Sequence, residues 1–126
     1  MQYQDSTNIA VLIPCFNEEQ TIGKVIDDFR RQLPQAEICV FDNNSTDQSV
    51  AIALQRGAKI LYEPRQGKGF VVETMFNKIL ADIYIMVDGD DTYPADCVHK
   101  LIEPILKHKA DMVVGTRLSE FKDRSF

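Results

Sequence analysis

Short apolar runs alternate with longer amphipathic segments along the chain. Five runs have the length and composition of strands buried on both faces, and they occupy residues 9–14, 38–41, 59–62, 83–87 and 112–114. Between them, apolar residues recur at helical spacing, as at Ile22, Val25, Ile26, Phe29 and Leu33. This alternation predicts an α/β fold with a mainly parallel sheet flanked by helices on both faces.

Polar residues between the runs predict where helices begin. Asn17 with Gln20, and Ser45 with Gln48, resemble capping boxes, and Pro94 is typical of the first turn of a helix. In parallel sheets of this kind, ligands bind beyond the carboxyl ends of the strands. The residues that follow the first, second and fourth runs are therefore the candidate site residues.

The length of 126 residues fits one ordinary domain. Fourteen Lys and Arg stand against nineteen Asp and Glu, and the net charge of −5 disfavours a nucleic-acid-binding surface, which needs an electropositive footprint. An anionic ligand would need a local basic spot. We expect residues 1–126 to form a single catalytic domain, incomplete at its C-terminal end because residues 118–126 contain no stop signal.

Cysteine usage and hydropathy indicate the compartment. Cys15, Cys39 and Cys97 are odd in number and lack metal-ligand spacing, which favours reduced thiols. No segment approaches the roughly 20 apolar residues of a membrane span, and the first residues lack the order of a signal peptide. We therefore expect a cytoplasmic protein.

The strongest chemical signal is the acidic turn after the fourth run, formed by Asp88, Gly89, Asp90 and Asp91. Carboxylates this close repel one another unless a cation or hydrogen-bond donors lie between them. Mg²⁺ or Mn²⁺ usually takes one or two protein carboxylates and completes its shell with phosphate and water. The turn therefore predicts a divalent metal site, and the alternative is a solvated acidic turn before the last helix.

Three further segments offer contacts for a nucleotide-like ligand. Asp42 follows an apolar strand directly, where its carboxylate can accept hydrogen bonds from a base or a ribose. Arg65 and Lys68 lie among glycines just before a helix, a combination that favours phosphate, although a mobile surface turn would have the same composition. Arg117 follows the fifth run, where it could bind phosphate or pair with an acid.

Five segments, taken in order, resemble family 2 glycosyltransferases: IAVLIPCFNEEQTIGKVI, VFDNNSTDQSV, RQGKGF, YIMVDGDDTYP and VVGTR. The likeness is greatest to dolichyl-phosphate mannose synthases and bacterial polyprenyl-phosphate relatives, and it covers residues 9–117. It implies the Rossmann-like A-type glycosyltransferase fold, a UDP- or GDP-linked sugar donor, a Mg²⁺ or Mn²⁺ ion and inversion at the anomeric carbon.

The resemblance also assigns the residues that recognise the nucleoside. Pro14, Phe16 and Glu18 match positions that line the nucleobase and ribose. Val40 and Asp42 match positions that hold the base. These five residues are therefore expected to set donor recognition.

The DxD turn and the last motif are assigned in the same way. Asp88, Gly89 and Asp90 match the DxD turn, with Asp88 and Asp90 as metal ligands and Asp90 in the central catalytic role, bridging to the diphosphate through the metal. Arg117 would meet phosphate or the sugar. Thr92 stands where some relatives have a glutamine that is a further metal ligand.

The implied acceptor is a polyprenyl phosphate, in cell-envelope glycan biosynthesis, with the full-length protein associated with a membrane. A lipid phosphate is already anionic, so we assign no general base, and Asp91 is only a weak candidate. Two alternatives stay open. Residues 87–92 also resemble the nucleophile turn of haloacid-dehalogenase-like phosphatases, and a non-catalytic sugar-nucleotide-binding domain would carry the same binding motifs.

Overall fold

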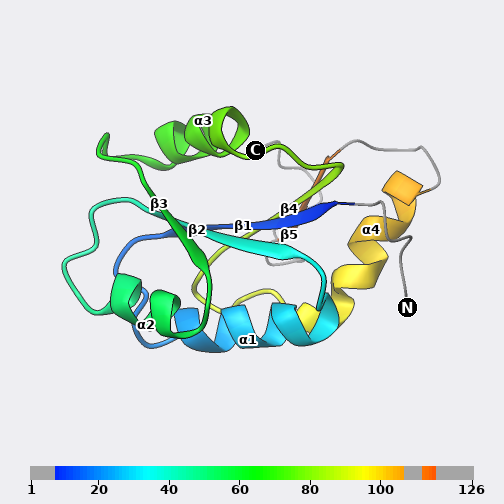
Figure 1. Ribbon diagram of the computed structural model, residues 1–126, viewed down its shortest axis with the longest axis horizontal. Coiled ribbons are helices and arrows are strands. Elements are labelled where there is room, and N and C mark those ends of the chain that lie inside the picture. The colour runs from blue at the N-terminus through cyan, green and yellow to red at the C-terminus, as the bar shows by residue number, and fades with distance from the viewer. Residues whose placement is uncertain (1–7, 107–111, 116–126) are drawn as a thin grey trace.

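The computed structural model describes residues 8–106 and 112–115. Within them, five parallel strands form one sheet in the order β3-β2-β1-β4-β5 (Figure 1). The strands are β1 (Ile9–Cys15), β2 (Glu37–Asp42), β3 (Lys59–Tyr62), β4 (Ile83–Val87) and β5 (Met112–Gly115). Each lies within one residue of its predicted bounds, because runs buried on both faces leave little ambiguity about where a strand lies.

Helices cover both faces of the sheet. The helical elements are α1 (Ile22–Gln32), α2 (Ser49–Gln55), α3 (Lys68–Lys78), the short 3₁₀ helix η1 (Ala95–Cys97) and α4 (Val98–Leu106). Helix α3 lies on one face, and α1 and α2 lie on the other (Figure 1). The predicted α/β fold is therefore confirmed. Among the described residues, no helix is long and apolar enough to cross a bilayer.

Alternate residues of the strands divide the core into two layers. Val11 and Ile13 of β1 pack with Phe29 of α1, in a cluster to which α2 and α4 also contribute. Leu12 belongs to the opposite cluster, which contains Met75 of α3. Side chains along a strand alternate between faces, so the sheet is buried on both sides and its central strands are apolar throughout.

The strand order reverses at β1, and this reversal positions the site. β1 pairs with β2 on one side and with β4 on the other. The chain therefore moves outward through β2 and β3 and returns past β1 to β4. In an open parallel sheet, the crevice beyond the carboxyl ends at such a switch point is where ligands bind.

The two predicted capping boxes are wrong. α1 begins at Ile22 and α2 begins at Ser49, and neither has a side-chain cap. Instead, the Oγ of Ser45 accepts a hydrogen bond from the backbone N of Asn17 at 2.8 Å, and the Oδ1 of Asn17 accepts one from the N of Thr46 at 2.8 Å. These polar side chains therefore join the loop after β1 to the loop after β2, which fixes the two loops against each other.

Candidate functional site

An open pocket of about 370 Å³ lies at the carboxyl edge of the sheet, at the strand-order reversal. The loop after β1, residues 66–68 at the beginning of α3 and the acidic turn after β4 all contribute to its lining. The lining residues are Pro14, Cys15, Phe16, Glu18, Asn43, Gln66, Gly67, Lys68, Val71, Asp88, Gly89 and Asp90. The structure thus brings together most of the residues that the sequence singled out for substrate and metal.

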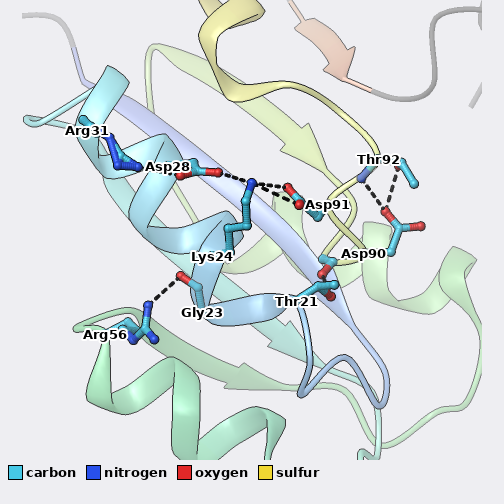
Figure 2. A network of polar contacts seen from close by, with 10 residues as sticks. Thr21, Gly23, Lys24, Asp28, Arg31, Arg56, Asp90, Asp91 and Thr92 are labelled. Atoms are coloured by element: carbon cyan, nitrogen blue, oxygen red, sulfur yellow. Dashed lines mark hydrogen bonds and ion pairs between the residues drawn. The ribbon is translucent and has the colours of Figure 1, made fainter.

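The acidic turn presents two carboxylates to this pocket. Asp88 is half-buried, and its Oδ1 accepts a hydrogen bond from the Nζ of Lys68 at 2.7 Å. Asp90 is exposed, and its Oδ1 accepts hydrogen bonds from the N of Thr92 at 3.1 Å and the Oγ1 of Thr92 at 2.8 Å (Figure 2). Among the described residues, both hydrogen bonds to Asp90 reach the same oxygen. Thr92 therefore orients Asp90 and leaves Oδ2 for a ligand.

Lys24 of α1 and Thr21, the residue just before α1, both contact this turn (Figure 2). The Oγ1 of Thr21 donates a hydrogen bond to the carbonyl of Gly89 at 2.5 Å. The Nζ of Lys24 lies 3.1 Å from the Oδ2 of Asp91, which has a φ of 64°. Because Asp91 pairs with α1 and is not among the pocket residues, its position gives no support to a role as general base.

Asp88 and Asp90 fit a divalent cation that is bound together with a ligand. The described residues contain no group of three or more His, Cys, Asp or Glu that could hold a metal by themselves. Mg²⁺ and Mn²⁺ suit one or two carboxylates when phosphate and water complete the shell. Burial raises the pKa of the neighbouring Glu18, and repulsion from Asp90 and Asp88 raises it further. The pocket therefore concentrates negative charge where a cation would relieve it.

Asp42 and Val40 differ in what they can reach. Asp42 is buried, its Oδ2 accepts a hydrogen bond from the N of Ser45 at 3.1 Å, and its buried Oδ1 has no partner among the described residues. A buried carboxylate oxygen without a donor is costly, which is typical of a position where a ligand supplies the donor. Val40 has no exposed surface and packs in the core cluster of α1. The expectation that Val40 contacts the base is therefore not met, because the helix layer covers it.

Arg65 does not face the pocket as the sequence suggested. Its Nε and Nη2 donate to the carboxylate of Glu63 at 3.1 and 3.0 Å, and its guanidinium lies 4.6 Å from the ring centroid of Phe70. Glu63 is buried, and it also accepts hydrogen bonds from the backbone N of Arg65 and from Thr74. The turn before α3 is therefore held by hydrogen bonds between Arg65 and Glu63. The cation that lines the pocket is Lys68, the first residue of α3. Arg117 lies outside the described residues.

The Glu63 carboxylate predicts an acid-sensitive fold. Hydrogen bonds from Arg65 and Thr74 lower the pKa of Glu63 from 4.5 to about 2. A group whose pKa is lowered by folding contributes stability above its ordinary pKa, and this contribution is lost as the pH falls through the folded value. We therefore expect Glu63→Gln to lower the melting temperature at pH 7 and to flatten its decline between pH 4.5 and 2.

Thermal unfolding measured from pH 7 to pH 2 checks this. Glu73→Gln is the matched control, because the exposed Glu73 carboxylate lies 3.6 Å from the same Arg65 guanidinium. Exposed ion pairs contribute little to stability, so the control should follow the wild-type pH profile. Parallel profiles for wild type and Glu63→Gln would contradict the role given to Glu63.

Comparison with known proteins identifies the family of the chain. Residues 10–126 match the family described as Glycosyl transferase family 2. Protein RfbJ of Shigella flexneri is 53% identical over 112 residues, which cover 89% of this chain and 87% of that protein. A dolichyl-phosphate hexose transferase of Haloferax volcanii is 32% identical over 114 residues, which cover 90% of this chain and 49% of that protein.

A solved structure of a sugar-transferring enzyme also matches the fold of this chain. Glucosyl-3-phosphoglycerate synthase of Mycobacterium tuberculosis, in complex with Mn²⁺ and UDP-glucose, matches with a TM-score of 0.71 and 27% identity, covering 80% of this chain and 40% of that chain. The chain thus spans most of RfbJ but less than half of the archaeal hexose transferase and of the synthase.

Proposed function

The chain belongs to glycosyltransferase family 2 and has the A-type fold, and from this premise we propose that it binds a nucleoside-diphosphate sugar in the pocket and transfers the sugar with inversion. The observation that carries the proposal is the convergence of Lys68, Asp88 and Asp90 on one pocket. A cation and two carboxylates suit a diphosphate held together with a divalent ion.

We place the diphosphate of the donor at the beginning of α3. Lys68 is the first residue of this helix, and the preceding Gly67 has a φ of 132°, which favours glycine. The beginning of a helix supplies backbone N–H groups and a positive dipole end, and Lys68 adds a full positive charge. The Nζ of Lys68 exchanges its contact with Asp88 for one with phosphate when the donor binds.

We place the nucleobase near Asp42, whose Oδ1 lacks a hydrogen-bond donor among the described residues. Asp42 pairs in register with Cys15, a pocket residue, so this oxygen lies at the same edge of the sheet as the pocket. A base N–H would satisfy the oxygen. The mycobacterial synthase is solved with UDP-glucose, which makes uridine the first base to test against guanosine.

The proposed site also includes a divalent cation. Asp88 and Asp90 would hold Mg²⁺ or Mn²⁺, which when bound offsets the charge that grows on the leaving diphosphate. Thr92 keeps Asp90 in one orientation, and Thr21 fixes the Gly89 carbonyl between the two carboxylates. The Mn²⁺ in the mycobacterial synthase supports the presence of a divalent cation.

We propose a polyprenyl phosphate as acceptor. The relative named dolichyl-phosphate hexose transferase supports a lipid phosphate. An anionic phosphate oxygen can attack the anomeric carbon without prior deprotonation, so no general base is needed. This fits the engagement of Asp91 by Lys24. The family membership leaves the phosphatase alternative without support.

The test combines binding and transfer. Calorimetry with UDP, GDP, UDP-glucose and GDP-mannose, with and without Mn²⁺, should show Mn²⁺-dependent binding of one nucleotide series. Incubation of the matching labelled donor with polyprenyl phosphate should then give a labelled lipid, and 3-phosphoglycerate is the competing acceptor. Binding without transfer to either acceptor would favour the non-catalytic alternative, and binding of no nucleotide would reject the proposal.

A further inference from the structure

Asn43 is a buried amide at the end of β2 that the sequence did not single out. Its Nδ2 donates to the carbonyl of Glu63 at 2.7 Å and to the carbonyl of Arg65 at 2.9 Å. Its Oδ1 accepts from the Nε2 of Gln66 at 3.1 Å and from the backbone N of Gly67 at 2.9 Å. All four contacts lie in residues 63–67, which we call the diphosphate loop.

These contacts use the whole hydrogen-bonding capacity of an asparagine side chain. The amide has two N–H donors and an oxygen with two lone pairs, and each is engaged. Although Asn43 lines the pocket, its amide has no donor or acceptor left for a ligand. Its position beside the pocket therefore points to an effect on the loop and not to direct contact with substrate.

Asn43 is itself fixed to the sheet. Its backbone N donates to the carbonyl of Cys15 at 2.9 Å, and the backbone N of Glu63 donates to the carbonyl of Asp42 at 2.9 Å. The diphosphate loop is thus attached to β2 through backbone at its first residue and through the Asn43 side chain along the rest of its length. A loop held at both points has little freedom to move relative to the strand ends.

The geometry of the diphosphate loop decides where Lys68 lies. Gly67 immediately precedes α3, and its N–H is one of the groups that Asn43 holds. Lys68 is the next residue, and its Nζ reaches Asp88 at 2.7 Å, across the pocket. A shift of Gly67 would move both the beginning of α3 and the ammonium group of Lys68.

We propose that Asn43 is a positioning residue that holds the diphosphate loop so that Lys68 and the beginning of α3 meet the diphosphate of the donor. This rests on the proposed function. Asn43 acts through the loop, so its loss weakens recognition of the diphosphate and leaves recognition of the nucleoside intact.

The first arm compares UDP with UMP by calorimetry in the presence of Mn²⁺. Leucine has the same branched side-chain shape and the same number of side-chain heavy atoms as asparagine, but its side chain makes no hydrogen bonds, so Asn43→Leu removes all four contacts. We expect the UDP affinity to fall about 10-fold or more, as losses of supporting residues around a binding site often do, while the UMP affinity stays within about twofold. Equal losses for the two nucleotides, or no loss, would overturn the proposal. Should Asn43→Leu not fold, Asn43→Ser removes fewer contacts and should show the same selectivity.

The second arm is a double-mutant cycle with Lys68→Ala. Residues that act through a common group show non-additive effects. If Asn43 acts through the position of Lys68, Asn43→Leu should cause little further loss of UDP affinity in the Lys68→Ala background. If the double variant loses UDP affinity by the product of the two single losses, Asn43 does not act through Lys68, and the proposal is overturned.

The third arm needs no donor and separates this inference from the proposed function. Hydrogen exchange at the Gly67 amide should accelerate in Asn43→Leu and stay unchanged in Ile83→Ala. Ile83 is buried at the amino end of β4, away from the pocket, so this variant controls for a general loss of stability. Absence of nucleotide binding by the wild type would reject the proposed function. Independently of that result, unchanged exchange at Gly67 in Asn43→Leu would overturn the role of Asn43 in the loop.

Discussion

Replacing Asp90 by asparagine should reduce sugar transfer at least about 100-fold and remove the Mn²⁺ dependence of donor binding. Thr92 holds one oxygen of Asp90, which leaves the other for a cation. Asparagine keeps the shape and can still accept from Thr92, but it lacks the negative charge that a divalent ion requires. The fold should therefore survive while the cation is lost.

Transfer rates and calorimetric titrations of UDP-sugar across a Mn²⁺ series measure this effect. Asp96→Asn is the matched control, since Asp96 is exposed in η1 and is not among the pocket residues. The control should keep wild-type activity and Mn²⁺ response. An Asp90→Asn variant that still responds to Mn²⁺ like the wild type would show that the cation binds elsewhere, and the assignment of Asp90 would be wrong.

The sequence predicted the sheet well because the strands are buried on both faces. A run such as residues 9–14 has no polar side to disturb its signal, and its bounds are met within one residue. Because the carboxyl ends of parallel strands share one edge, the sequence also predicted that Phe16 and Asp90 would meet, and they line one pocket together with Lys68. The position of the site thus follows from the topology, and its chemistry from the residue types at the strand ends.

Contacts across the sequence were not predictable in this way. Asn43 and Glu63 are buried polar residues whose side chains form hydrogen bonds with residues 2 to 24 positions away, and no local pattern marks them. Asn17 and Ser45 had a local pattern, a capping box, but each is used to join two loops. Side chains that can cap a helix can equally bond a neighbouring loop, and only the tertiary structure decides between the two. The cytoplasmic location and the role of Arg117 stay predictions.

Asp42→Asn should weaken binding of the nucleoside about 10- to 100-fold, which corresponds to the loss of a hydrogen bond to a charged group. The Oδ2 of Asp42 is held by the N of Ser45, and asparagine can retain that contact through its own oxygen. The amide NH₂ then occupies the place of Oδ1, the buried oxygen that lacks a partner among the described residues. A base N–H would meet a donor there in place of an acceptor.

The same substitution should leave the melting temperature of the ligand-free protein at or above the wild-type value, because a buried ionised carboxylate is costlier than a neutral amide. Glu37→Gln, at the exposed opposite end of β2, is the matched control for both readouts. UMP and UDP should lose affinity equally in Asp42→Asn, whereas Asn43→Leu should affect UDP alone. A fall in melting temperature with unchanged UMP affinity would make Asp42 a structural residue, and the base would have to be placed elsewhere.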